Sequence, residues 1–365
     1  MKYDYVIAGA GFAGCVLAER LASQLDKKVL LIDKRPHIGG NAYDEVNDAG
    51  IRVHLYGPHL FHTNDETIVR YLSQFTEWHP YEHRVMSFVN GTFVPMPINR
   101  RTVNMLFGIE LSNDEQVKEF FEQERVDIPN IATSEDVVLS KVGKRLYELL
   151  YRGYTLKHWG IDPSKLAPAV CGRIPVRTDL NDRYFDDRYQ MMPRDGYSAL
   201  FAKMTGHPNI TISVKTGFSD VPVSSYDRVI FTGPIDEYFG FIHGKLPYRS
   251  LRFEFETLQC DQIQPVTVVN YPNAEPFTRI TEFNHISGQK NGMTTIAREF
   301  SMEKGDPYYP VPNSGNEAMY RKYEDEAVKL STVHFVGRLG TYRYYNMDQV
   351  VGQALKTFKT IAGRA

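Results

Sequence analysis

The sequence predicts an α/β protein, and three observations in residues 5–33 support this fold class. A short apolar run, Tyr5–Ala8, is followed by a segment at 9–14 (GAGFAG) that matches G-x-G-x-x-G. A helical pattern then covers about residues 15–25. A second apolar run ends at Asp33, 22 residues after Gly11, and a ribose-binding carboxylate is expected at about 20. Together these features predict a Rossmann-like dinucleotide-binding unit.

Each glycine has a physical role in this interpretation. Gly9 permits the tight turn, Gly11 lets the backbone approach a pyrophosphate, and Gly14 lets the helix pack against the strand. The helix N-terminus presents free N–H groups and a partial positive charge to the phosphates, and we also expect Phe12 and Ala13 at the cofactor. A glycine-rich turn without a ligand is the alternative, but the agreement of strand, helix, second strand and acid favours the dinucleotide site.

The residues after the second strand narrow the cofactor to FAD. Segment 34–41 (KRPHIGGN) resembles the extension of FAD-binding proteins of the glutathione-reductase-like class, in which a loop after this strand covers the cofactor. A surface turn is the alternative. We expect Lys34, Gly39, Gly40 and Asn41 to contact FAD.

The composition is ordinary for a soluble globular protein and argues against several classes of protein, such as nucleic-acid-binding, disulfide-rich and membrane-spanning proteins. The chain has 365 residues, enough for two or three packed lobes, and its net charge of −2 gives no reason to expect a nucleic-acid partner. Its 3 cysteines form no C-x-x-C pair, which argues against a disulfide framework and a structural zinc site. No apolar run approaches the roughly 18 residues that span a bilayer, and the first strand leaves no room for a signal peptide. We expect a cytoplasmic protein without membrane insertion.

Further elements follow along the chain. Val85–Val89 and Thr92–Val94 flank Asn90-Gly91, a strong hairpin signal. Residues 160–185 are polar and contain several prolines, which predicts a long, functional loop. Helical patterns cover 103–106, 115–123, 134–151, 197–204, 316–330 and 347–361. Strand patterns cover 210–214, 228–231, 251–256, 267–270, 294–299 and 333–336.

The last strand–glycine–helix unit, from residue 333 on, resembles the C-terminal unit that returns to the nucleotide sheet in FAD-binding proteins. The nucleotide domain is then discontinuous, with other lobes inserted. We predict three parts: an FAD-binding Rossmann-like domain (1–76, 190–240 and 316–365), an inserted helical domain (100–189, with a mobile lid loop at about 165–180) and an antiparallel β-sheet substrate domain (77–99 and 241–315).

Segment 54–63 (HLYGPHLFHT) holds three histidines, which suggests a metal at first sight. No cysteine supports such a site, and Gly57-Pro58 breaks any helical face, so we expect no metal. Structural histidines are one alternative, and a loop against a flavin ring is the other.

Several motifs, in order along nearly the whole chain, resemble those of the UDP-galactopyranose mutase family. They are GGNAY (39–43), YGPHLFHT (56–63), YTLKHWG (154–160), RIPVR (173–177), PYYP (307–310) and GRLGTYRY (337–344). The length resembles that of the shorter, bacterial type.

The resemblance implies an FAD-dependent isomerase that interconverts UDP-galactopyranose and UDP-galactofuranose by ring contraction. In the family FAD acts in its reduced form, and flavin N5 is the nucleophile at the anomeric carbon. A reductant such as NADPH or NADH is therefore implied, and the bacterial relatives imply a homodimer.

The resemblance also implies the site residues. Planar guanidinium groups match phosphate oxygens, and an aromatic face such as that of Tyr154 stacks on uracil. The implied catalytic residues are Arg173, Arg279, Trp159, Arg338 and His62. The implied substrate-binding residues are Tyr154, Thr155, Trp159, Arg173, Tyr184, Asn270, Arg279, Tyr309, Arg338 and Tyr344. His59, Gly337 and Asp348 join the cofactor-binding residues named above.

Other functions stay open at this point. A flavin amine oxidase-type oxidoreductase shares the nucleotide fold, but the paired arginines and tyrosine-rich loops favour an anionic nucleotide sugar over an amine. A UDP-N-acetylgalactosamine mutase would use the same mechanism, and relatives with that specificity carry Arg at the position of His59, so His59 favours the plain hexose. A flavoprotein without catalytic activity is the last alternative. Asn346 departs from the Asp that relatives usually carry, which leaves the role of that position open.

Overall fold

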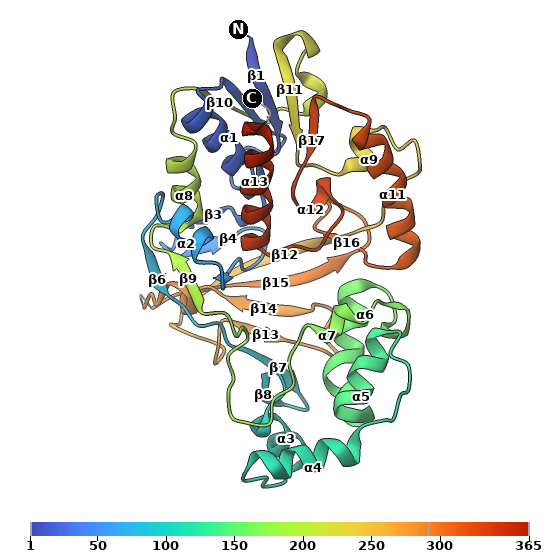
Figure 1. The fold of residues 1–365 in the computed structure, drawn as a ribbon. Coiled ribbons are helices and arrows are strands. Elements are labelled where there is room, and N and C mark those ends of the chain that lie inside the picture. Colours follow the sequence, from blue (N-terminus) through green and yellow to red (C-terminus); the bar gives the residue numbers. More distant parts are fainter. Residues whose placement is uncertain (1, 291, 364–365) are drawn as a thin grey trace.

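The computed structural model describes residues 2–290 and 292–363. Figure 1 shows a sheet with helices α1 and α13 at one end of the molecule, long strands across the middle, and a group of helices at the other end. None of the helices in the described residues is both long enough and apolar enough to cross a membrane.

In the part of the chain that the structure describes, five parallel strands form the dinucleotide-binding sheet. In spatial order they are β10 (Ile210–Val214), β2 (Val29–Asp33), β1 (Tyr3–Ala8), β11 (Tyr226–Phe231) and β17 (Val333–Phe335). Strands from the beginning, the middle and the end of the chain thus share one sheet. The prediction of a discontinuous Rossmann-like domain is confirmed.

Helices α1 (Phe12–Leu25) and α13 (Met347–Ala362) pack against each other beside this sheet (Figure 1). The apolar face of α1, with Cys15, Leu17 and Leu21, is fully buried in the main core. α1 begins directly after Gly11, so its first turn stays at the end of β1, where the glycine-rich segment lies.

A second sheet holds seven strands of the described residues and forms the middle of the molecule. In spatial order they are β16 (Tyr309–Pro310), β12 (Tyr248–Leu258), β15 (Thr294–Met302), β14 (Arg279–Glu282), β13 (Val268–Asn270), β7 (Val85–Val89) and β8 (Thr92–Met96). The predicted hairpin of β7 and β8 is confirmed. The sheet was predicted to be antiparallel, and its pairs are antiparallel except β13 with β7, which run parallel. The exception arises because this hairpin comes from a distant, earlier part of the chain and joins the sheet beside β13.

The helical part follows this hairpin and contains α3 (Arg100–Phe107), α4 (Asp114–Glu124), α5 (Ser134–Leu146), the π-helical η2 (Tyr147–Arg152) and α6 (Gly153–Trp159). Side chains of Asn99, Asn113 and Thr133 accept backbone N–H groups at the starts of α3, α4 and α5, which satisfies donors that the helices leave free. α5 bends at Gly143, which has φ 76°. The bend directs η2 and α6 toward the seven-stranded sheet.

The short elements were not predicted, because segments of three to seven residues are too short to show a clear periodic pattern. They include two small sheets, β3 (Asp44–Val46) with β4 (Arg52–His54), and β9 (Tyr189–Pro193) with β5 (Phe61–Thr63) and β6 (Trp78–Pro80). The short helical elements are η1 (Gly40–Ala42), α2 (Glu66–Leu72), η4 (Phe218–Asp220), η5 (Val223–Ser225), α9 (Ile235–Tyr238), α10 (Asn284–Ser287) and α12 (Gly337–Gly340). The other helices, α8 (Gly196–Met204) and α11 (Ser314–Val328), match predicted ranges closely.

Segment 160–185 is not the continuous loop that the sequence predicted. It contains η3 (Pro163–Lys165) and α7 (Ala169–Gly172). The backbone N–H and the hydroxyl of Ser134 donate to Leu166 and Ala167 of this segment, at 2.9 and 2.6 Å. These bonds to α5 explain the local order, which composition could not show.

We predict that Gly143→Ala destabilises the protein by about 3 kcal/mol, because left-handed strain adds to overpacking. A Cβ at position 143 would lie 2.0 Å from the carbonyl oxygen of Glu124. Gly108→Ala is the matched control, because Gly108 has φ +63° but open space around its Cβ position; it should cost only about 1 kcal/mol. Urea unfolding measures both values, and equal losses would contradict the role assigned to the bend.

Candidate functional site

Two cavities meet near the centre of the molecule. The first, here called the glycine-loop cavity, has a volume of about 290 Å³ and lies at the ends of β1 and β2. The second, the arginine–tyrosine cavity, has a volume of about 440 Å³ and lies between the seven-stranded sheet and the helical part. His59, Arg338 and Met347 line both. A molecule in one cavity therefore faces a molecule in the other.

The glycine-rich segment leaves a recess for an anion in the glycine-loop cavity. Gly9 has φ +103°, and a Cβ there would lie 2.0 Å from Thr232 Oγ1. At Gly11 an added Cβ would meet only Gly40 Cα, at an ordinary contact distance of 3.7 Å, so the backbones of the two glycines lie against each other here. The first turn of α1 has no side-chain cap and no acidic residue. Its free N–H groups suit a pyrophosphate.

Asp33 contributes to this recess in two ways. Its Oδ2 accepts the backbone N–H of Ala10 at 2.8 Å, and its Oδ1 accepts that of Arg35 at 2.9 Å. These bonds hold the glycine-rich segment against the end of β2. A carboxylate has about four lone-pair sites, so Asp33 keeps acceptor capacity toward the cavity it lines, as ribose binding requires.

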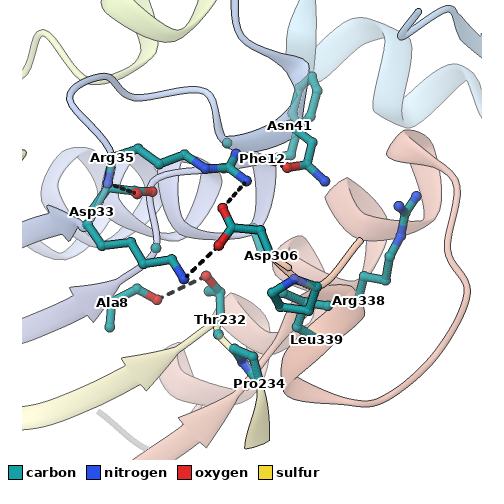
Figure 2. Close-up of a pocket in the computed structure, with 18 of the residues that line it drawn as sticks. Ala8, Phe12, Asp33, Arg35, Asn41, Thr232, Pro234, Asp306, Arg338 and Leu339 are labelled. Carbon is teal, nitrogen blue, oxygen red and sulfur yellow. Dashed lines mark hydrogen bonds and ion pairs between the residues drawn. The ribbon is translucent and has the colours of Figure 1, made fainter. Parts of the chain in front are cut away.

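Figure 2 shows further residues that line the glycine-loop cavity and that the sequence analysis did not name, among them Arg35, Thr232 and Asp306. Asp306, from the turn after β15, lies 3.5 Å from Lys34 Nζ and 3.6 Å from Arg35. Arg35 also donates to Asn41 Oδ1 at 2.9 Å. Thr232, at the end of β11, donates to the carbonyl oxygen of Ala8 at 2.9 Å and lines the same cavity.

Most of the residues predicted to bind the cofactor line this cavity: Gly9, Gly11, Phe12, Ala13, Asp33, Lys34, Gly39, Gly40, Asn41, His59 and Gly337. Of the described residues, Gly14 and Asp348 were expected there but do not line it. A Cβ at Gly14 would lie 1.9 Å from the carbonyl oxygen of Gly9, so only glycine lets α1 pack this closely on the end of β1. Asp348 accepts from Thr63 Oγ1 at 2.9 Å, which ties α13 to β5 instead.

Three guanidinium groups enter the arginine–tyrosine cavity from three elements. Arg173 follows α7, Arg279 begins β14, and Arg338 lies in α12. The guanidinium carbons of Arg173 and Arg338 lie 4.7 and 5.2 Å from the centre of the Tyr344 ring. Arg279 Nη2 donates to Tyr154 Oη at 2.6 Å. Such a concentration of planar cations suits an anion with two phosphates.

Glu299 is the buried counter-charge of this cavity. It is 3% exposed, and its Oε1 lies 3.1 Å from Arg279 Nε and accepts from Thr278 Oγ1 at 3.0 Å. Glu299 and Arg279 stand opposite each other on β15 and β14. The sequence analysis missed this residue, although an acidic side chain at the end of the strand predicted at 294–299 is a weak signal for it.

The histidines near the cavity are held by specific contacts. Burial lowers the pKa of His59 to about 3, so its ring is neutral. His59 Nδ1 lies 2.8 Å from the carbonyl oxygen of Gly57, and the proton of the neutral ring is therefore on Nδ1. His62 Nδ1 lies 2.8 Å from Asp187 Oδ2, and its ring stacks on Phe185.

All residues predicted for catalysis or substrate binding line this cavity: His62, Tyr154, Thr155, Trp159, Arg173, Tyr184, Asn270, Arg279, Tyr309, Arg338 and Tyr344. Asn346 also lines it, and its backbone N–H donates to Gln349 Oε1 at 2.9 Å at the start of α13. His83 and His158 line it as well and were not predicted. Both are buried, and burial lowers the pKa of each. The mobility of the lid segment stays a prediction.

Comparisons with known proteins agree with this geometry. A sequence model of the UDP-galactopyranose mutase family matches residues 149–344, and one of NAD(P)-binding Rossmann-like domains matches residues 7–75. The chain is 40% identical over 360 residues to a probable UDP-galactopyranose mutase of Klebsiella pneumoniae, covering 97% of this chain and 93% of that one. It is 35% identical over 363 residues to a dTDP-fucopyranose mutase of Escherichia coli, covering 96% of each.

A crystal structure of reduced UDP-galactopyranose mutase is similar over 100% of this chain and 95% of that one, with a TM-score of 0.81. Its sequence identity is 17%, so this likeness supports the fold alone.

We predict that Tyr344 ionises at lower pH than an ordinary tyrosine. Burial raises the pKa of its phenol, but Arg173, Arg338 and Arg279 outweigh burial and lower the pKa below its usual 10.0. A titration of phenolate absorbance should show a transition below pH 10.0 that Tyr344→Phe lacks. Inorganic pyrophosphate should raise this pKa, because an anion neutralises the same guanidinium groups. An identical titration curve for Tyr344→Phe would contradict the arrangement.

Proposed function

Because the chain belongs to the UDP-galactopyranose mutase family, we propose that it is an FAD-dependent isomerase that interconverts UDP-galactopyranose and UDP-galactofuranose by ring contraction. Family membership rests on the family match over residues 149–344 and on 40% identity across nearly the whole of a relative. The nucleotide-sugar substrate of this proposal comes from the similarity to mutases of nucleotide sugars.

One observation carries the proposal: the arginine–tyrosine cavity opens onto the glycine-loop cavity at His59 and Arg338. The recess at Gly9 and Gly11 fits the pyrophosphate of FAD, and Asp33 fits its ribose. When bound, reduced FAD would supply a nucleophilic nitrogen, N5, for the anomeric carbon of the sugar. A flavin amine oxidase would not require guanidinium groups from three elements beside the cofactor.

The chain's own residues have electrostatic and positioning roles in this proposal. Arg173, Arg279 and Arg338 bind the diphosphate and stabilise the negative charge that UDP carries when its bond to the sugar breaks. Glu299 holds Arg279 in place. Tyr154, whose ring lies parallel to that of His158 at 5.9 Å, offers an aromatic wall for the uracil ring.

His59 and Trp159 would border the sugar in this arrangement. His59 is a neutral hydrogen-bonding group at the junction of the cavities. Trp159 is 4% exposed and has Tyr309 and Tyr344 as ring neighbours. Reduction by NADPH, NADH or another donor, a homodimeric assembly and a cytoplasmic location complete the proposal, and these three rest on the resemblance to the family.

The main test is conversion by the reduced enzyme. Purified protein with dithionite should interconvert UDP-galactofuranose and UDP-galactose, followed by chromatography, whereas the oxidised enzyme should not. The same assay with dTDP-fucose and UDP-N-acetylgalactosamine tests whether the enzyme is selective for the sugar and the nucleobase of its substrate. The first compound is included because the Escherichia coli relative is a dTDP-fucopyranose mutase. No conversion of UDP-galactofuranose under reduction would refute the proposal. Hydrogen peroxide formed from an amine would support an oxidase instead.

We predict that Arg173→Ala slows turnover or weakens UDP binding by about 10- to 100-fold, because one charged hydrogen bond contributes about 1.5–3 kcal/mol. FAD content should not change, since Arg173 lines the arginine–tyrosine cavity and not the glycine-loop cavity. Arg70→Ala is a control, because the Arg70 side chain is 76% exposed on α2. Steady-state kinetics and flavin absorbance check both variants; wild-type kinetics for Arg173→Ala would count against its role.

A further inference from the structure

Lys157 lies between two elements that both contribute residues to the arginine–tyrosine cavity, α6 and the hairpin of β13 and β14. It lies on α6, the helix that also carries Tyr154, Thr155 and Trp159. Its half-buried side chain points away from that cavity's lining and toward the turn between β13 and β14. Lys157 Nζ donates to the carbonyl oxygens of Glu275 at 2.9 Å and Phe277 at 3.1 Å.

Lys157 Nζ also donates to the carbonyl oxygen of Tyr271, so one ammonium group holds three carbonyls of a single turn. An ammonium group has three donors, and this arrangement uses all of them on the backbone. Burial lowers the pKa of Lys157, and the charge of Glu275 acts in the opposite direction.

The turn at 271–278 joins two residues of the site. Asn270 and Arg279 are cross-strand partners at the ends of β13 and β14. The base of the turn is closed by the N–H of Tyr271, which donates to the carbonyl oxygen of Thr278 at 2.9 Å. A shift of the turn as a body would therefore carry Asn270 and Arg279 with it.

The same face of the helical segment contacts the turn at two more positions. A Cβ at Gly153, four residues before Lys157, would lie 2.3 Å from the carbonyl oxygen of Pro272, so only glycine permits this approach. Asn273 Nδ2 donates to the carbonyl oxygen of Leu149 at 3.5 Å. Leu149, Gly153 and Lys157 are spaced four residues apart and form one face.

We infer that Lys157 is a positioning residue, which fixes the turn at 271–278 to α6 and thereby sets Arg279, which binds the diphosphate, at a fixed distance from Tyr154, which faces the uracil ring. The role follows from the contact between these two elements: Arg279 Nη2 donates to Tyr154 Oη at 2.6 Å on the cavity side, and Lys157 joins the same two elements on the other side. The inference rests on the proposed function only for the identity of the anion.

The test compares Lys157→Met with wild type, since methionine keeps an apolar stem of similar length and removes the charge and the donors. Lys157→Met should weaken UDP binding by about tenfold, which corresponds to about 1.4 kcal/mol, while FAD content stays at the wild-type value. Hydrogen exchange at the Tyr271 and Thr278 amides should become faster. Lys144→Met, an exposed lysine on α5, is the matched control and should match wild type in all three measurements.

A double variant separates positioning from general stabilisation. If Lys157 acts through Arg279, then Lys157→Met should weaken UDP binding by less in an Arg279→Lys background than in wild type, because the two changes affect one contact. Lys157→Arg keeps the charge but not the geometry of the three hydrogen bonds, so it should lose less UDP affinity than Lys157→Met. If Lys157→Met does not fold, Lys157→Arg takes its place in both comparisons.

Unchanged UDP affinity in a folded Lys157 variant, or losses that simply add in the double variant, would overturn the positioning role. A wild-type protein that binds UDP but converts no UDP-galactose would instead refute the proposed reaction and leave the UDP-binding comparison valid. A wild-type protein that does not bind UDP would refute both the diphosphate site and the role of Lys157 in it.

Discussion

The arrangement of the site depends on placing three guanidinium groups together in a largely buried cavity. Like charges repel, and burial makes each charge more costly. Glu299 neutralises one of them, and the rings of Tyr309 and Tyr344 face Arg338 at 5.3 and 5.2 Å. Asp186 and Asp187 also line the cavity, but they face Arg177 and His62. Among the described residues, Arg173 and Arg338 therefore have no carboxylate partner, and this favours a phosphate-bearing ligand.

This requirement also explains why the site is assembled from distant parts of the chain. Each arginine is held by a different element, α7, β14 or α12, so no single element brings all three cations together. The seven-stranded sheet fixes Arg279 beside Glu299 through strand register. α12 follows the last parallel strand, β17, and so places Arg338 next to the glycine-loop cavity. Arg338 lines both cavities, so α12 lies at their junction.

Much of the fold could be predicted from the sequence where the signal is local. The unit from β1 to Asp33, the β7–β8 hairpin and α13 each have a periodic pattern or a turn signal of their own. The parallel pairing of β13 with β7 has no local signal, because it depends on which sheet edge an early hairpin reaches. The resemblance to a family indicated the arginines and tyrosines of the cavity. Glu299 and Asp306 were missed because their partners lie 20 or more residues away in sequence and are found only through the fold.

The junction of the two cavities limits what His59 can do. A histidine next to Arg338 and buried in the protein would be costly to protonate. Its pKa of about 3 reflects burial first; the hydrogen bond to Gly57 acts in the opposite direction, and His54, Arg338 and Arg35 lower the pKa further. The backbone N–H of His59 donates to His54 Nδ1 at 3.0 Å, so a second buried, neutral histidine holds the backbone of this loop in place. With Nδ1 occupied by Gly57, the His59 ring keeps one free acceptor, Nε2. A neutral acceptor suits a sugar hydroxyl or a flavin N–H, whereas a cation here would add a fourth positive charge to a cavity that already holds three guanidinium groups.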